Sequence, residues 1–390
     1  MITDKRDKLI WILGLYIILK PIYLFNSGAM QISDFVMVVC LIYVLGIRRF
    51  SISMRRRFYQ CIMQVAFLCL YFGVVNGVWS LALHENLLRN TLFYLFNLAV
   101  FTLCAVLLSG ADPQKVRKQL INACLISEAV SVVGIFLGSG SGRAVGFFNN
   151  PNQLGYYSML ILTLVFLLTD GKMGWKESIC TAMSIMLIVA SGSKAAAVSA
   201  VVMIFLRIVN TKELTPMELV RRLALLALAV GALYVLLYSE SSTLLANKSI
   251  MMMRYRILGW SNESDSDLLY GRGYARVLEM GDNILWGMGE GDYMRFQYMI
   301  GKEVHSTFIS LLVSYGLIGL FGFCHLLFRI VRCKGHTWTN IVILSGMLSY
   351  SMTHNGIRNT LMWIILAVML WKNDLRIFSG MQVGREARLA

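Results

Sequence analysis

A histidine stands at the start of a long apolar run, where its side chain could accept a proton. The run begins at His305 and Ser306 and continues past Gly316, Gly319 and Gly322. An imidazole titrates near neutral pH and can therefore take a proton from an attacking hydroxyl group. A lone histidine at a membrane interface is also ordinary, because its ring is partly apolar. His305 is thus a candidate catalytic residue, with Ser306 as a candidate substrate contact beside it.

The three glycines of this run recur at every third residue. On a helix that starts near His305 they would form a stripe of small side chains on which a second helix packs closely. With a rise of 1.5 Å per residue, His305 and Gly316 would lie about 16 Å apart along the helix. We therefore expect Gly316 and Gly319 to be structural and to hold the imidazole at the outer membrane face.

A second polar cluster falls in the segment from Gly142 to Gln153. A helix start after Pro151 would present unpaired N–H groups that favour an anion, and the Arg143 guanidinium could add two parallel hydrogen bonds. Turn formation and helix capping explain the same asparagines equally well. The candidate ligands are Arg143, Asn149, Asn150 and Asn152.

The composition indicates a membrane protein that crosses the bilayer many times. Of 390 residues, 57% are hydrophobic and 15% are charged, and the mean hydropathy is +0.65. Such a chain is not a soluble domain. The first apolar run has basic residues before it but no small-x-small cleavage site after it, so we expect a retained first helix. The eight cysteines show no disulfide or metal-binding spacing, and we expect no metal and no cofactor.

The net charge of +15 could indicate nucleic acid or acidic lipid as a partner, but the basic residues follow a topological pattern. Placing the basic clusters in the cytoplasm collects 24 of the 36 lysines and arginines on that side. Neighbouring clusters must then be separated by an even number of crossings. This parity predicts an all-α, polytopic protein of about 12 transmembrane helices with both termini cytoplasmic. Because the basic residues are explained by topology, we expect no nucleic acid as a partner.

Parity also predicts where three long apolar stretches divide. The stretch 177–206 should split at Ser-Gly-Ser-Lys194, 58–109 at His84–Arg89, and 338–371 at His354–Arg358. One outer segment is much longer than the others and is expected to have a function. The predicted regions are N-terminal helices at 1–139, a core at 140–328 with a short outer loop (139–153) and a large extracytoplasmic loop (240–304), a helix pair at 329–378 and a disordered tail at 379–390.

Twelve basic residues remain on the predicted outer side, where membrane insertion disfavours them. Cations kept at such positions indicate anion binding, although each one could also be a solvated surface residue. They are Lys20, Arg89, Arg143, Lys194, Lys248, Arg254, Arg256, Arg272, Arg276, Arg295, Lys302 and Arg358.

These residues resemble a known family, the bacterial O-antigen ligases and surface-polysaccharide polymerases. The family signature is His, then Asn, Ser or Gln, nine residues, Gly, two residues, and Gly, Thr or Tyr, at the end of a large periplasmic loop. His305, Ser306, Gly316 and Gly319 have this spacing. The resemblance extends to Arg-x-x-Gly-Phe-Phe-x-Asn-Pro-Asn at 143–152, to the turn before Lys194, where family members usually have arginine, and to Gly-x-Gly-x-Gly at 287–291.

The resemblance implies an inverting, metal-independent glycosyltransferase of the bacterial inner membrane, with its active site on the extracytoplasmic side. Its donor and acceptor would be oligosaccharides linked to undecaprenyl diphosphate, and membrane lipid, a flippase and a chain-length regulator would be its partners. His305 would orient or deprotonate the acceptor hydroxyl, while Arg143 and a loop arginine would bind the diphosphate. Arg276 is the first choice for that loop arginine and Arg272 the second. The predicted substrate-binding residues are Arg272, Lys194, Asn149, Asn152, Ser306, Arg254 and Arg256.

Three functions stay open on these residues. A polymerase would join lipid-linked repeat units, and an O-antigen ligase would use the same chemistry to transfer the glycan to a lipid A core or another acceptor. We favour the polymerase. A transporter for the same lipid-linked oligosaccharide would need polar residues at the membrane midplane and broken helices in both halves. Asp34 and Glu128 are the main acidic residues within the apolar runs. The basic residues cluster at one face, which favours a one-sided reaction over alternating access.

Overall fold

The computed structural model describes residues 9–26, 28–46, 56–137, 143–169, 173–210, 251, 269–298 and 300–386. Every regular element within these ranges is a helix, as the all-α prediction expected. The first half contains α2 (Trp11–Leu19), α3 (Ile32–Gly46), α4 (Arg56–Leu83), α5 (Leu88–Leu108), α6 (Pro113–Leu137), α7 (Pro151–Leu168), α8 (Trp175–Ser191) and α9 (Lys194–Val209). The second half contains the short 3-10 helices η2 (Tyr274–Glu279), η3 (Gly281–Ile284) and η4 (Tyr293–Arg295), followed by α14 (Thr307–Val331), α15 (Thr337–Thr353) and α16 (Thr360–Glu386).

The three divisions predicted from charge parity are present in the structure. One helix pair is α4 and α5, a second is α8 and α9, and a third is α15 and α16. Between α8 and α9 the chain reverses at Gly192, whose φ of 57° is left-handed, and the Ser193 side chain then caps α9. Five of the described helices, α4, α5, α6, α7 and α14, are long and apolar enough to cross a membrane.

The total of twelve crossings and the extent of the 240–304 loop stay predictions, because 211–250 and 252–268 lie outside the described residues. One boundary differs from expectation. Residues 379–386, predicted to belong to a disordered tail, continue α16 as a helix.

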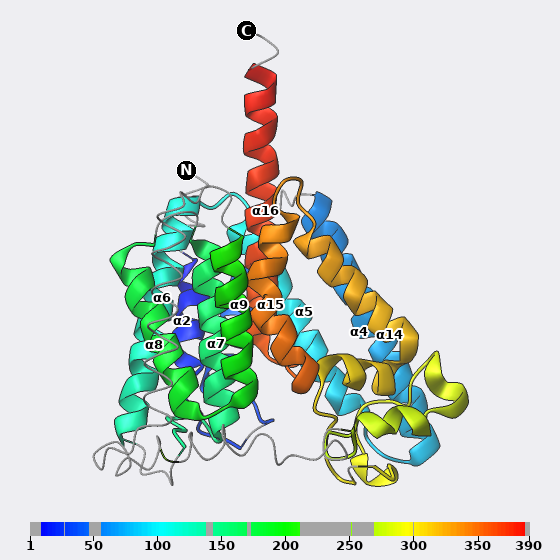
Figure 1. Cartoon of the computed structure of the whole chain (residues 1–390). Coiled ribbons are helices and arrows are strands. Elements are labelled where there is room, and N and C mark those ends of the chain that lie inside the picture. Colours follow the sequence, from blue (N-terminus) through cyan, green and yellow to red (C-terminus); the bar gives the residue numbers. More distant parts are fainter. Residues whose placement is uncertain are drawn as a thin grey trace.

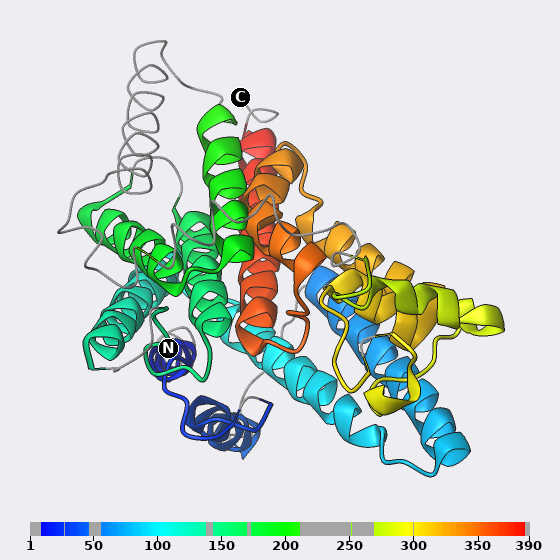
Figure 2. The same ribbon diagram turned by 60° about the horizontal axis from the view of Figure 1, so that its bottom comes forward.

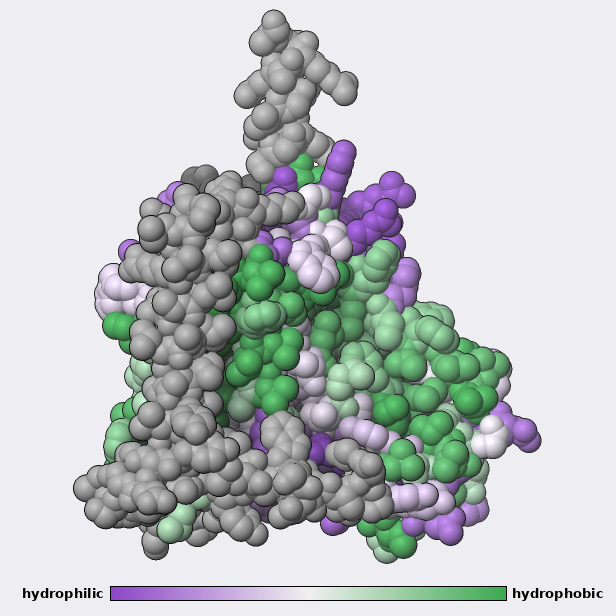
Figure 3. Space-filling view, viewed as in Figure 1, coloured by the Kyte–Doolittle hydropathy of each residue, from purple (hydrophilic) through white to green (hydrophobic). Residues whose placement is uncertain are grey.

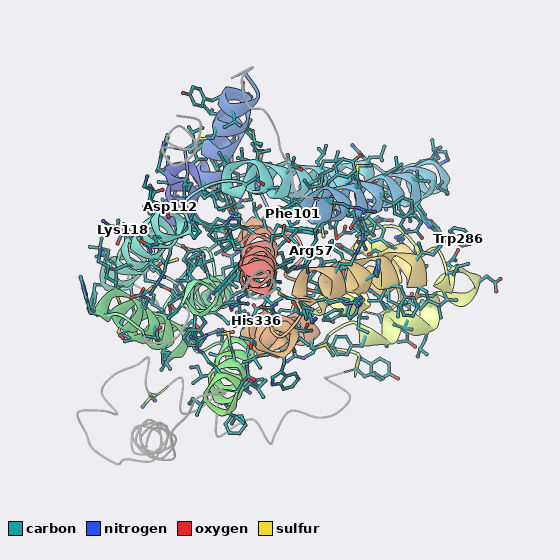
Figure 4. All side chains as sticks on the ribbon, turned by 90° about the horizontal axis from the view of Figure 1, so that it is seen from above. Arg57, Phe101, Asp112, Lys118, Trp286 and His336 are labelled. Atoms are coloured by element: carbon teal, nitrogen blue, oxygen red, sulfur yellow. The ribbon has the colours of Figure 1, made fainter. Side chains whose placement is uncertain are left out.

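The helices α7 and α16 form the centre of the fold (Figures 1 and 4). Every residue of α7 from Leu154 to Leu168 is buried, and so is every residue of α16 from Thr360 to Asp374. Helices that are apolar on all sides are expected to be surrounded by other helices. Seen along α16 in Figure 4, the remaining helices are arranged around it.

Helices α4 and α14 pack on each other and lean away from α9 and α15 (Figure 1). Less of their apolar surface is buried than in α7, as expected for helices that face lipid. Gly319 and Gly322 contribute to this pairing. A Cβ on Gly319 would lie 3.3 Å from the ring of Phe72, and one on Gly322 would lie 2.7 Å from Leu68, both on α4. The close packing predicted for the glycine stripe is therefore confirmed at these two positions.

Gly316 does not continue this stripe, and that part of the prediction is wrong. Its φ of 64° and ψ of −168° break α14. The backbone N–H groups of Met288 and Gly289 donate to the carbonyls of Val313 and Ser314, both at 2.9 Å. A loop thus supplies hydrogen bonds at the break, which is how an interrupted helix is tolerated within a packed structure. Gly316 is structural, but its role is to admit this loop rather than a second helix.

Candidate functional site

A cavity of about 780 Å³, lined by both polar and apolar side chains, opens at the end of the bundle where α14 begins. In Figure 2, which brings this end forward, the connection between α15 and α16 lies between α7 and the 269–304 segment. The cavity walls come from distant parts of the chain, because helix ends from both halves meet here. The lining residues fall within 20–34, 89–96, 150–156, 303–305 and 350–360.

His305 lines this cavity at the end of the segment that leads into α14. Its backbone N–H donates to the carbonyl of Arg272 at 3.0 Å, which fixes the position of the residue. Its Nδ1 is buried and has no hydrogen-bond partner of good geometry among the described residues. Because the residue lines the cavity while Nδ1 is buried, the Nε2 edge is the one available to a ligand. Burial, followed by the charge of Arg272, lowers the pKa of His305 and favours a neutral ring.

His354 lines the same cavity, within a short stack of rings. The ring stacks on Tyr350 with centroids 4.7 Å apart, and Tyr350 stacks on Tyr156 at 4.1 Å. The His354 side chain lies just beyond the last helical residue of α15, at its C-cap. Burial, with a smaller contribution from Arg272, lowers the pKa of His354 to about 4. Both histidines at this cavity are therefore neutral near pH 7.

Arg358 enters the cavity from the connection between α15 and α16 and is bound by two carboxylates. Its Nε and Nη2 donate to Oε1 of Glu290 at 3.0 and 2.5 Å, and its Nη1 lies 2.5 Å from Oε1 of Glu303. Glu290 is fully buried, and its other oxygen accepts hydrogen bonds from Tyr94 at 2.9 Å and Tyr315 at 2.6 Å. A buried carboxylate satisfied in this way fixes the guanidinium strongly.

Two further cations line the cavity. Lys20 donates to Oδ1 of Asp34 at 3.3 Å, and Tyr16 donates to the same oxygen at 3.1 Å, so this lysine is held in a nearly buried pair. Arg89, at the start of α5, is exposed, and no described residue forms a hydrogen bond or an ion pair with it. Arg89 is thus the cavity cation whose charge is available to a bound anion.

Arg143 lies beside the cavity rather than in its wall. Its Nε donates to the carbonyl of Ser191 at 2.8 Å, and its Nη2 donates to Oδ1 of Asn152 at 2.8 Å. Asn152 itself lines the cavity. A Cβ on Gly192 would lie 3.3 Å from the Arg143 Nε, so the turn before α9 packs directly on this guanidinium. The Arg143 segment and the turn before Lys194, both features of the family resemblance, therefore meet in space.

The other asparagines of this segment have local roles. The Asn150 side chain accepts from the Gln153 N–H at 3.0 Å and caps α7, with Pro151 as the first helical residue. Asn149 donates to the carbonyl of Phe25 at 2.8 Å and is not part of the cavity wall. The capping interpretation therefore accounts for Asn150.

Several predicted site residues lie outside the cavity wall. Arg276 is fully buried, and its Nε and Nη2 donate to the carbonyls of Tyr298 and Lys302 at 2.8 and 2.6 Å. Ser306 is buried and caps α14 by accepting from the Ile309 N–H. Lys194 is the first residue of α9, next to the turn that contacts Arg143. Arg254 and Arg256 lie outside the described residues.

Arg272, unlike Arg276, acts on the two histidines of the cavity wall. Its Nη1 donates to the carbonyl of Thr353 at 3.2 Å, and its charge acts on both His305 and His354. Since its carbonyl also receives the His305 N–H, Arg272 positions the imidazole and influences its protonation. Of the two loop arginines considered, only Arg272 is near the cavity histidines.

The cavity wall contains four residues that were not among the predicted site residues, namely Arg89, Lys20, Arg358 and His354. The three cations could have been suspected, because they belong to the twelve basic residues assigned to the predicted outer side. His354 and Arg358 also delimit the predicted division between α15 and α16. Spacing alone could not show that this division meets the His305 segment. Among the described residues, no three His, Cys, Asp or Glu side chains come together in a way that could hold a metal ion.

No family model and no curated protein matches this sequence. The described residues define the class of the protein only broadly, as a helical membrane protein with a cavity at one end of its helices whose wall includes three cations.

Proposed function

We propose that this protein is a membrane glycosyltransferase that polymerises a surface polysaccharide from repeat units linked to undecaprenyl diphosphate. The observation that carries the proposal is the common cavity of His305, Arg89, Lys20 and Arg358, four residues from distant parts of the chain. A neutral imidazole beside several cations matches a reaction in which a hydroxyl loses a proton while a diphosphate departs.

In the proposed reaction, Nε2 of His305 accepts the proton of the acceptor hydroxyl. The acceptor oxygen then forms a bond to the anomeric carbon of the donor, on the face opposite the diphosphate. The bond between that carbon and the diphosphate oxygen breaks, and its electron pair stays on the diphosphate. A proton on the buried Nδ1 of the neutral ring would leave Nε2, the nitrogen on the cavity side, as the acceptor.

The cations would stabilise the negative charge that develops on the leaving diphosphate. Arg358 and Lys20 are already held by carboxylates, so their positions change little when the substrate binds, and such preorganised charges are the most effective. Arg89 would give the direct, unshared contact. Arg143, acting through Asn152, would fix the amide that faces the ligand. The exposed apolar surfaces of α3 and α5 near this end would accommodate the polyprenyl chain.

The position of the cavity favours a reaction on one side of the membrane over transport. Its lining lies at one end of the helices, whereas a transporter needs access from both ends. Under this proposal the protein lies in a bacterial inner membrane with the cavity on the extracytoplasmic side. Polymerase and ligase would share this chemistry and differ in the acceptor.

The test uses purified full-length protein in lipid nanodiscs and the lipid-linked repeat unit extracted from the producing cells. A ladder of longer lipid-linked products, resolved by electrophoresis and mass spectrometry, is expected from the repeat unit alone. A single shifted product that forms only when a lipid A core is added would identify a ligase and overturn the polymerase proposal. Folded protein that extends neither acceptor would contradict glycosyl transfer altogether.

A further inference from the structure

A second cavity, of about 710 Å³, lies at the opposite end of α4 and α14. Ten residues line it, five of them lysine or arginine and none of them acidic. The helix starting at Arg56 and the helix ending at Val331 meet here, so their terminal basic residues converge. The basic members are Arg56, Arg57, Arg329, Arg332 and Lys334.

Two of these cations hold the helix ends together. Arg57 donates through Nη2 to the carbonyls of Arg329, Ile330 and Arg332, at the C-terminal end of α14, where carbonyls have no partner within the helix. Arg329 donates to the side-chain oxygens of Gln60 and Gln64 on α4 at 3.2 and 3.4 Å. These partners are neutral, so they satisfy hydrogen bonds without cancelling the charge.

The remaining cations are free to meet a ligand. Arg56 and Lys334 are exposed, and no described residue bonds to either side chain. The Arg332 guanidinium lies over the ring of Phe328, 5.8 Å from its centre. Among the described residues, Asp374 forms an ion pair with this group of cations, with its Oδ1 3.9 Å from Nη1 of Arg57, and it does not line the cavity. A strong positive potential therefore remains inside the cavity.

Exposed apolar side chains extend directly from this basic cavity along the same two helices. Figure 3 shows the hydrophobic surface of this part of the molecule with hydrophilic side chains above it. The exposed apolar residues closest to the cavity in sequence are Tyr59, Met63 and Phe67 on α4, and Phe321 and Phe328 on α14.

We propose that this cavity binds the phosphate headgroup of an anionic phospholipid, with the acyl chains along the apolar faces of α4 and α14. Basic cavities between transmembrane helices are suited to such headgroups, and the adjoining apolar surface selects a lipid over a free phosphate. Arg56, Arg332 and Lys334 contact the phosphate, while Arg57 and Arg329 hold the two helix ends in position. The site is distinct from the His305 cavity and does not depend on the function proposed for it.

The test measures lipid binding to the purified full chain by native mass spectrometry, with phosphatidylglycerol, phosphatidylcholine and sn-glycerol phosphate as probes. The double variant Arg56→Gln/Lys334→Gln removes two cations whose side chains form no hydrogen bond or ion pair with the described residues. We expect phosphatidylglycerol to bind at least tenfold more tightly than phosphatidylcholine. The double variant should weaken phosphatidylglycerol binding by about fivefold for each cation removed.

The matched control is Lys115→Gln/Lys118→Gln, which removes the same charge from exposed positions on α6 at the same end of the bundle. Figure 4 shows Lys118 well away from Arg57. The control should leave binding within twofold of the parent, and thermal unfolding without lipid should confirm that both variants fold. Equal losses in both variants, or no loss in the first, would overturn the proposal. So would sn-glycerol phosphate binding as tightly as phosphatidylglycerol, which would indicate a site for free phosphate.

Discussion

The rings of His305 and His354 lie 6.2 Å apart and nearly perpendicular, at 71°, on the wall of one cavity. Burial lowers the pKa of each, and Arg272 adds to the effect on both. Two imidazolium ions at this distance would repel each other, so the pair is stable in its neutral form. A neutral pair provides a proton acceptor at physiological pH.

Replacing His305 with alanine should reduce glycan extension by about 10²- to 10⁴-fold, the usual contribution of a general base. The protein should still insert and fold, because the His305 side chain makes no hydrogen bond of good geometry to the described residues. Product ladders from purified protein provide the measurement. His84→Asn is the control, since His84 is exposed, has a φ of 55° that asparagine tolerates, and does not line the cavity. Normal product length in His305→Ala would remove this residue from the mechanism.

The rate of extension should fall as the pH drops below the pKa of His305, which lies below its ordinary value of 6.5. Because the folded-state pKa is lowered, the contribution of His305 to stability is also present above pH 6.5 and lost as the pH falls. Arg272→Gln removes a nearby positive charge and should raise this pKa, which moves the acidic limb of the rate profile to higher pH. A limb that stays in place, or moves to lower pH, would contradict the role given to Arg272.

Arg143→Lys should lower activity nearly as much as Arg143→Ala. Lysine cannot bond to the Ser191 carbonyl and the Asn152 amide in the same geometry, and each lost charge-assisted hydrogen bond costs about 1.5 kcal/mol. Asn152→Ala, which removes one partner, should give an intermediate loss. Rates per folded molecule are the readout. Full activity with lysine would reduce this position to a general positive charge.

Arg89→Gln should weaken substrate binding without changing stability, because Arg89 is exposed and unpaired among the described residues. We expect KM for the lipid-linked donor to rise about tenfold, while the thermal midpoint shifts by less than 1 °C. Glu85→Gln, a charge change just before α5, is the control and should leave KM unchanged. An unaltered KM in Arg89→Gln would mean that the free charge does not contact the diphosphate.

Arg276→Met should destabilise the fold by about 3 kcal/mol rather than abolish chemistry. The substitution removes both hydrogen bonds from the fully buried Arg276 to the carbonyls of Tyr298 and Lys302, which are themselves part-buried, and each lost bond to a charged donor costs about 1.5 kcal/mol. The measurement is thermal unfolding in detergent together with activity per folded molecule, which should stay within threefold of the parent. An inactive variant with unchanged unfolding would restore Arg276 to the catalytic role that the family resemblance implied.

The turns that divide three long apolar stretches into helix pairs could be predicted, because they depend only on the hydropathy of each stretch and the charges at its two ends. Basic clusters at both ends of an apolar stretch require an even number of crossings, and this rule located the turns at His84–Arg89, Ser191–Lys194 and His354–Arg358. The cap at Asn150 followed from the proline after it. These features need no knowledge of which helices are neighbours.

The convergence at the cavity depends on tertiary packing and could not be predicted in detail. His354 and Arg358 meet His305 only because α14, α15 and α16 end on the same side, next to one another. The break at Gly316 was missed for a similar reason. Its three-residue spacing fits a packed helix, and only the insertion of residues 285–289 shows that the backbone leaves the helical path there.

The central place of α16 has a consequence for how the molecule is made. This helix follows all the other described helices in the chain, yet it is surrounded by them, and the connection that leads into it carries Arg358 to the cavity. During synthesis from the N-terminal side, the earlier helices must stay loosely associated, leaving a gap that α16 later fills. Assembly of the nascent chain in the bilayer is therefore completed at the centre of the fold, and its final step both closes the core and brings the walls of the cavity together.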